Sequence, residues 1–360
     1  MNTRLNNIFN KTSNDERITT EDALILYNEA DLADLAKMAN TIREKKFGKQ
    51  ATFIRNFHIE PTNICIYQCK FCSYHRKEGE EGSWILSIDE MVSRALASGT
   101  EQMSEVHIVG AVYKDWDIYF YSNLLKRIRQ ARPNIHIKAF SAVEISYMCD
   151  AVGLDLDEGL LLLKESGLDS IPGGGAEIFE PSIRKQICPD KINGEDWLRV
   201  HETAHKNGIP TNATMLYGHI ENYSHRVEHM QLLRQLQDKT KGFNAFIPLK
   251  YRNMHNDLSG IKEVSITDDF KNYAIARIFM DNVPHIKAYW PMLGKENAFL
   301  SLHYGVDDLD GTIDDSTKIY EMAGAIAKPE MSVDNFIEQV KLAGYEPAER
   351  DALYGIIQKY

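Results

Sequence analysis

Residues 60–75 read Glu60-Pro-Thr-Asn-Ile-Cys65-Ile-Tyr-Gln-Cys69-Lys-Phe-Cys72-Ser-Tyr-His75 and follow a β-rich run at residues 53–59. Three cysteines therefore lie on one loop after the first predicted strand. Thiolates are soft ligands that select iron-sulfur clusters or zinc. Buried structural cysteines have no reason to gather in a loop. The spacing predicts a metal-binding loop whose ligands are Cys65, Cys69 and Cys72.

Two metals fit this loop. Structural zinc requires a closed tetrahedral set, which His75 could complete. A 4Fe-4S cluster held by three cysteines leaves one iron open to another ligand, and we favour this interpretation. A small electron carrier would also hold a cluster, but it would be shorter and supply a fourth cysteine. The remaining cysteines, Cys149 and Cys188, are interpreted as isolated thiols because they lie far from the loop in sequence.

From Phe53 onward, short β-rich runs alternate with helical segments, a pattern typical of parallel strands joined by crossover helices. One helix is expected to begin at Ser87-Ile-Asp-Glu90, which can form a capping box. Others are expected to end at Gly99, Gly167 and Gly208. The candidate strands are residues 53–59, 105–110, 135–141, 168–172, 211–217, 243–249 and 284–290.

The alternation predicts an α/β fold with a full or partial (β/α) barrel, whose active site lies at the carboxyl ends of the strands. A doubly wound open sheet is the alternative. We expect a helical N-terminal extension at 1–50, with a helix pair over 18–45, and a barrel at 51–320. A helical C-terminal extension is expected at 321–360, with Pro347 at a helix start.

Composition limits the classes of partner. The net charge of −11 without a long basic block argues against a nucleic-acid binder. No apolar run approaches the roughly 18 residues that a membrane span requires. The polar, acid-containing start lacks a secretory or transit signal, so the sequence predicts a cytoplasmic protein without nucleic-acid or membrane partners.

The CxxxCxxC spacing, with the aromatic Phe71 before its last cysteine and a strand before the loop, resembles the radical S-adenosylmethionine (SAM) superfamily. The resemblance implies two cofactors: a 4Fe-4S cluster, and SAM as co-substrate on the open iron. The reduced cluster would cleave SAM to methionine and a 5'-deoxyadenosyl radical, which the barrel would shield. It also implies a flavodoxin- or ferredoxin-type reductant.

Residues at other strand ends carry this resemblance further. Gly110 keeps one member of the superfamily's glycine pair, and Ser141 and Glu144 offer a hydroxyl and a carboxylate at the third strand end. Gly218 and Glu221 match the superfamily's GxIxGxxE pattern. The residues that the resemblance implies for cofactor binding are Tyr74, Gly110, Ser141, Glu144, Tyr217, Gly218 and Glu221.

From about residue 18 to 355 the chain is similar to a family that includes aminofutalosine synthase, dehypoxanthine futalosine cyclase and the tyrosine-modifying half of the deazaflavin synthase. The segments 209–221, 281–294 and 307–312 look most like aminofutalosine synthase. That resemblance implies a transferase of menaquinone biosynthesis, the futalosine pathway, that joins the adenosyl group of SAM to 3-[(1-carboxyvinyl)oxy]benzoate with loss of a carboxylate. The product would be 6-amino-6-deoxyfutalosine.

An aryl dicarboxylate substrate needs cationic or N–H donors. The run Gly173-Gly-Gly175 would let backbone N–H groups approach a ligand. The residues expected to bind substrate are His58, Gly173, Gly174, Gly175, His219 and Tyr289. Further candidate donors are Lys250, Arg252 and Lys287. The candidates for stacking are Tyr217, Phe246, Tyr289 and Trp290. The sequence predicts no particular catalytic acid or base.

Overall fold

The computed structural model describes residues 3–97, 102–312, 318–319, 321–324 and 330–360. The helices are α1 Thr3–Ser13, α2 Thr20–Glu29, α3 Leu32–Phe47, α4 Ile88–Ala95, α5 Ile118–Ala131, α6 Ala142–Asp150, α7 Leu156–Glu165, α8 Pro181–Ile187, α9 Gly194–Lys206, α10 Tyr223–Thr240, α11 Ile266–Phe279, α12 Trp290–Leu293, α13 Lys295–Leu300, η1 Ser301–Tyr304 (a 3-10 helix) and α14 Val333–Leu342. The strands are β1 Gln50–Ile54, β2 Asn56–Ile59, β3 Glu105–Ile108, β4 His136–Ala139, β5 Thr211–Tyr217, β6 Phe243–Lys250, β7 His285–Ile286, β8 Asp308–Gly311, β9 Glu346–Arg350 and β10 Ile356–Lys359.

The strands form a closed ring of parallel neighbours. β2 pairs with β3 and β3 with β4, while bridges at Ser170 and Ile171 place that segment between β4 and β5. β5 pairs with β6 and β6 with β7, and a bridge from Lys287 to Asp308 leads to β8. β8 pairs with β1, which continues through Arg55 into β2. The predicted barrel is therefore confirmed in its full form, and the open sheet is excluded.

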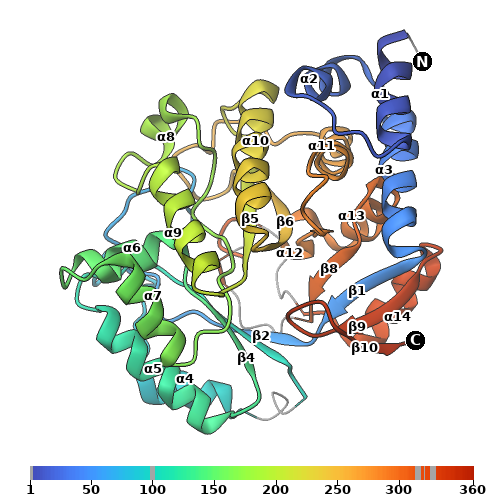
Figure 1. Cartoon of the computed structure of the whole chain (residues 1–360). Coiled ribbons are helices and arrows are strands. Elements are labelled where there is room, and N and C mark those ends of the chain that lie inside the picture. The colour runs from blue at the N-terminus through green and yellow to red at the C-terminus, as the bar shows by residue number, and fades with distance from the viewer. Residues whose placement is uncertain (1–2, 98–101, 313–317, 320, 325–329) are drawn as a thin grey trace.

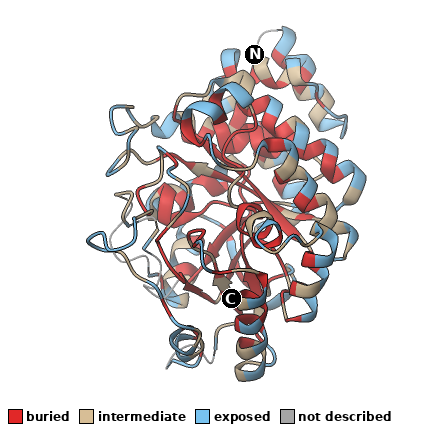
Figure 2. Cartoon of the chain, turned by 90° about the vertical axis from the view of Figure 1, so that its left-hand side faces the viewer, coloured by how far each residue is buried: buried red, intermediate tan, exposed pale blue. Residues whose placement is uncertain are grey.

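Helices cover the outside of this ring (Figure 1). Buried residues follow the strands and the inward faces of the helices (Figure 2). All seven residues of β5 are buried, as expected for a parallel strand with helices on one side and the barrel interior on the other. The capping box of Ser87 and Glu90 starts α4 as predicted. Gly167 and Gly208 take positive φ after α7 and α9, whereas Gly99 lies outside the described residues.

The predicted N-terminal helix pair is confirmed as α2 and α3, and α1 precedes it. These helices pack against α10 and α11 on the outside of the barrel. Arg43 of α3 is fully buried and donates hydrogen bonds to the carbonyl oxygens of Val306, Gly48 and Gln50. Its side chain therefore joins the N-terminal helices to the start of β1 and to the segment just before β8. Among the described residues, no helix has the length and apolar character to cross a membrane.

The C-terminal expectation was only partly right. α14 lies within the predicted helical extension, with Ser332 as its N-cap, but no helix begins at Pro347. Residues 346–350 form β9, in which Pro347 lies opposite Ala51 of β1, and β10 pairs antiparallel with β9. The fixed φ of proline suits the beginning of a strand as well as the beginning of a helix, and pairing with β1 decides between them.

Candidate active site

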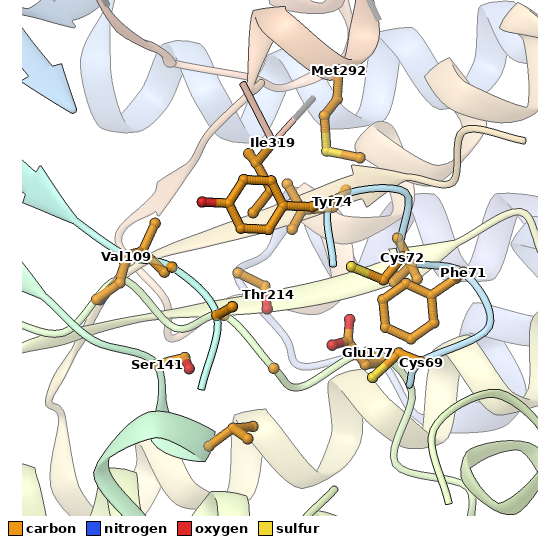
Figure 3. A pocket seen from close by; sticks show the side chains of 18 of the residues that line it. Cys69, Phe71, Cys72, Tyr74, Val109, Ser141, Glu177, Thr214, Met292 and Ile319 are labelled. Atoms are coloured by element: carbon orange, nitrogen blue, oxygen red, sulfur yellow. The ribbon is translucent and has the colours of Figure 1, made fainter. Parts of the chain in front are cut away.

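A cavity of about 270 Å³ opens between the cysteine loop and the carboxyl ends of the barrel strands. Figure 3 shows Cys69 and Cys72 of the loop beside Glu177 at one side of the cavity, with Ser141 at the other side. The residues that were predicted for the site and line this cavity are Cys65, Cys69, Cys72, Tyr74, Gly110, Ser141, Glu144, Gly174, Gly175, Arg252, Lys287 and Tyr289. Most of the predicted site is therefore brought together.

Backbone hydrogen bonds hold the cysteine loop over the barrel. The N–H of Cys65 donates to the carbonyl of Arg76 at 3.2 Å, and the N–H of Ile66 donates to that of Val112 at 3.0 Å. Lys70 donates to the carbonyl of Ile187, at the end of α8, at 2.8 Å. The loop is thus attached at three points, and its three cysteines are free thiols.

Glu144 organises the opposite wall of the cavity. Its Oε2 accepts hydrogen bonds from the backbone N–H and the hydroxyl of Ser141, both at 2.7 Å, in the capping box of α6. Its Oε1 accepts the N–H of Gly110 at 3.3 Å. Burial raises the pKa of Glu144 to about 7, against the opposing effect of these N–H and hydroxyl donors. Gly110, Ser141 and Glu144 therefore act as one unit at the ends of β3 and β4.

The three glycines after residue 172 differ in role. A side chain on Gly173 would meet the carbonyl oxygen of Asn212 at 2.1 Å, and one on Gly175 would meet Val143 at 2.5 Å. Both have a φ of +87°. Gly174 has no neighbour closer than Ser141 Cβ at 3.6 Å, and its carbonyl accepts the indole N–H of Trp197. Gly173 does not line the cavity, so its expected contact with substrate is replaced by close packing on β5.

Four predicted residues at the end of β5 lie outside the cavity lining: Tyr217, Gly218, His219 and Glu221. Tyr217 donates to Asp269 of α11 at 2.8 Å, since alternation along β5 turns Thr214 and Leu216 inward and Tyr217 outward. Glu221 accepts the N–H groups of Gly218 and His219 at 2.6 and 2.9 Å. Tyr217 is thus held in β5 against α11, and Gly218, His219 and Glu221 are held in the turn before α10. Their contact with ligands stays a prediction.

Four other candidates also lie outside the cavity lining. His58 is buried beside His107, with ring centroids 4.6 Å apart, and Lys250 donates to Asp269 at 2.7 Å. Phe246 is fully buried, and the indole N–H of Trp290 donates to the carbonyl of Gly311. Among the aromatic candidates for stacking, Tyr289 alone lines the cavity.

The inner end of the cavity carries a charged layer, of which the sequence analysis named Lys287 but not Glu105, Lys138 or Asp310. Lys138 donates to Glu105 at 2.5 Å, and Lys287 donates to Asp310 at 2.9 Å. Both lysines are almost fully buried. Nε2 of His107 is buried beside them without a hydrogen-bond partner. In the sequence, titratable residues alternate with apolar ones in β3 and β4. This alternation could have predicted the charged layer, because alternate side chains of a barrel strand point inward.

Known proteins match the whole chain. Residues 59–233 match the radical SAM superfamily, and residues 240–359 match the CofH/MqnC C-terminal region. The chain is 41% identical to the "Aminodeoxyfutalosine synthase" of Thermus thermophilus over 355 residues, which cover 98% of this chain and 95% of that protein. The chain is a radical SAM enzyme of the CofH/MqnC family. It acts on a small molecule and uses a 4Fe-4S cluster and SAM.

A second relative of this radical SAM enzyme carries a different name. The "5-amino-6-(D-ribitylamino)uracil--L-tyrosine 4-hydroxyphenyl transferase" of Methanocaldococcus jannaschii is 36% identical over 353 residues, with 96% of this chain and 98% of that protein covered. Among solved structures, the FeFe-hydrogenase maturase HydG from Carboxydothermus hydrogenoformans superposes with a TM-score of 0.76 at 18% identity. That match covers 97% of this chain and 80% of HydG, and it supports the fold alone.

The cysteine loop of this radical SAM enzyme fits the cluster. In the described ranges, no three His, Cys, Asp or Glu side chains surround one point closely enough for a single metal ion. This spacing is compatible with a 4Fe-4S cluster, in which three thiolates bind three different irons. All three thiols line the cavity beside Gly110, Glu144 and Gly174, so a ligand of the open iron would contact these residues.

Two further residues of the site were missed from the sequence, Glu177 and Lys191. They line the cavity beside the cysteine loop and form an ion pair of 2.6 Å. Cys188 was interpreted as isolated, but it directly follows Ile187, whose carbonyl accepts the N–H of Lys70 in the cysteine loop. Cys149 packs against Gly159 of α7. Lys191 sits in a loop without a recognisable motif, so only the tertiary structure reveals it.

We expect Glu144→Gln to weaken SAM binding and to remove the rise of SAM affinity between about pH 6 and about pH 8. Because burial raises the pKa of Glu144 to about 7, its carboxylate ionises as the pH rises from about 6 to about 8. The ionised form accepts a hydrogen bond from an amino or hydroxyl group of SAM more strongly than the acid does. The loss should be about tenfold, since a hydrogen bond to a charged group contributes about 1.5 kcal/mol.

Equilibrium dialysis of cluster-loaded protein with SAM measures this effect. The affinity of the unaltered chain should rise over this pH range, and that of Glu144→Gln should stay flat. Glu158→Gln, an exposed change on α7, is the control. The same rise in all three proteins would show that Glu144 does not contact SAM.

Proposed function

We propose that the chain is an aminodeoxyfutalosine synthase. In this reaction the adenosyl group of SAM is joined to 3-[(1-carboxyvinyl)oxy]benzoate with loss of carbon dioxide, and the product is 6-amino-6-deoxyfutalosine. The observation that carries the proposal is the 41% identity with the Thermus thermophilus enzyme of that name over almost the whole of both chains. We further propose a place in menaquinone biosynthesis, in the cytoplasm, with a flavodoxin- or ferredoxin-type electron donor.

The charged inner end of the cavity supports an acidic substrate. A lysine ammonium has three N–H donors, and Lys138 and Lys287 each use one toward a single carboxylate in their shortest contacts. Arg252 lines the same cavity and pairs with Glu263 at 3.2 Å. These cations, together with His107, would receive the carboxylates of an aryl dicarboxylate within hydrogen-bond distance.

The two ends of the cavity suit the two reactants. When bound, the cluster and SAM supply the 5'-deoxyadenosyl radical. Gly110, Ser141 and Glu144 would hold the SAM side, and Tyr289 would pack against the aromatic ring between the two ends. The enclosing barrel would exclude water while the reactants are held together.

Isotope labelling tests this proposal. The reduced enzyme is incubated with SAM labelled in the adenosine ring and with the enol-ether benzoate, and products are separated by mass. The proposed activity places the label in a product that has also lost carbon dioxide. Reactions without the benzoate, and with the Cys65→Ala variant, are the controls.

The family offers a specific alternative outcome. The relative from Methanocaldococcus jannaschii is named as a transferase acting on 5-amino-6-(D-ribitylamino)uracil and L-tyrosine. A parallel reaction with these two compounds, and another with a cyclase substrate, dehypoxanthine futalosine, would release the label as free 5'-deoxyadenosine. Stoichiometric labelled 5'-deoxyadenosine and no labelled adduct from the benzoate would replace the proposal by one of these reactions.

A further inference from the structure

A buried ion pair, Glu177 and Lys191, lies against the cysteine loop. The Lys191 ammonium donates to Glu177 Oε1 at 2.6 Å, and the two side chains are 11% and 13% exposed. The same ammonium lies 5.5 Å from the ring centroid of Phe71, which stands between Cys69 and Cys72 in the sequence. In Figure 3 the Glu177 carboxylate points toward Cys69 and Cys72. A charged pair therefore faces the position at which three thiols would hold a cluster.

The backbone fixes both members of the pair. Glu177 has a φ of +49°, in the left-handed region, and its carbonyl accepts the N–H of Leu216 in β5 at 2.8 Å. The N–H of Lys191 donates to the carbonyl of Cys188, and the preceding carbonyl, that of Ile187, accepts the N–H of Lys70 in the cysteine loop. Lys191 and the cysteine loop are thus attached to adjacent residues at the end of α8, while Glu177 is attached to β5.

The positive member of the pair lies beside the loop. Lys191 lines the same cavity as Cys65, Cys69 and Cys72. Its side chain is only 13% exposed, so little water screens its charge. The Glu177 carboxylate also lies beside the loop, and its charge acts in the opposite direction to that of Lys191.

We propose that Lys191 raises the reduction potential of the 4Fe-4S cluster held by Cys65, Cys69 and Cys72, and that Glu177 positions its ammonium. Reduction adds one electron from an external one-electron reductant, so the cluster gains one negative charge. A fixed cation in a buried site stabilises that added charge, because the surroundings screen it poorly. Net charge and neighbouring groups are established determinants of iron-sulfur potentials.

The test is an anaerobic redox titration of cluster-loaded protein, with dithionite as reductant and the electron paramagnetic resonance signal of the reduced cluster as readout. No SAM or substrate is added. Lys191→Met removes the charge and keeps an unbranched side chain, Lys191→Arg keeps the charge, and Glu177→Gln keeps an acceptor for Lys191 without its own charge. Lys185→Met, an exposed change on α8, is the control.

Lys191→Met should lower the ratio of reduced to oxidised cluster at a fixed potential about tenfold, which is 59 mV for one electron. Lys191→Arg and Lys185→Met should stay near the original midpoint, and Glu177→Gln should move it in the positive direction. An unchanged midpoint in Lys191→Met would overturn the proposal, as would an equal shift in Lys185→Met. If Lys191→Met binds no iron, Lys191→Gln, which also removes the charge, is titrated in its place: a negative shift supports the proposal and no shift overturns it.

Discussion

Replacing Cys65, Cys69 or Cys72 with alanine is expected to abolish cluster loading and, with it, the cleavage of SAM. Each thiolate would bind a different iron, so the remaining two cannot take over the lost position. The cavity lining offers no further cysteine within its described residues. Iron and sulfide content, the brown absorbance of anaerobically prepared protein, and release of 5'-deoxyadenosine measure the effect.

Cys188→Ala is the strict control for these variants. Cys188 is a buried thiol whose pKa burial raises, and the charge of Lys191 opposes that rise as it does at Cys69. Cys149→Ala is a second control on α6, where burial raises the thiol pKa to about 11. Both controls should keep their iron. Equal iron loss from Cys188→Ala and Cys69→Ala would mean that the ligand set is misassigned.

Arg350→Met is expected to lower the free energy of unfolding by about 3 to 5 kcal/mol, the usual cost of leaving one charge of a buried pair alone. Arg350 of β9 is fully buried and donates to both carboxylate oxygens of Asp308 in β8. Asp308 also accepts the hydroxyl of Thr52 in β1, which lies between those strands. Urea denaturation at neutral pH measures the change, with exposed Lys359→Met as the control.

The pH dependence of this difference follows from the same pair. Burial raises the pKa of Asp308, but Arg350 and Lys287 outweigh it, so the folded-state pKa lies below the usual value. A lowered carboxyl pKa contributes stability above the unfolded-state value of about 3.9, and this contribution is lost as the pH falls. The two proteins should therefore differ fully from about pH 7 to about pH 5 and converge at lower pH. A constant difference down to about pH 2 would contradict this account.

The sequence predicted the barrel because strand and helix periodicities alternate clearly from Phe53. It predicted the cluster loop because three thiolates at this spacing are typical of a metal site. It did not predict β8, whose residues Asp308–Gly311 look like a turn. Only the tertiary contacts of Asp308 with Arg350 and Thr52 explain an all-buried strand of this composition. The strand at Pro347 was missed for a similar reason, since its partner β1 lies almost 300 residues earlier.

The site was predictable where a motif places a residue at an inward position, as for Gly110, Ser141 and Glu144. At the end of β5 the site was not predictable, because a motif match does not show which way the Tyr217 side chain points. Nor does it show that the Glu221 carboxylate already accepts hydrogen bonds from the N–H groups of Gly218 and His219. Lys287 lay in a segment already given for its resemblance, but the charge layer that it forms with Lys138 arises only when β4 and the end of β7 face each other across the barrel.

The pairing of β1 with both β8 and β9 has a consequence for synthesis on the ribosome. Residues 50–54 emerge early, yet both of their strand partners lie beyond residue 307. Until those residues leave the exit tunnel, the first strand has unpaired N–H and C=O groups, the kind of edge that templates association with other chains. Closing contacts of such sequence separation is slow, so this edge of the first strand stays unpaired until residues 308–350 have been synthesised.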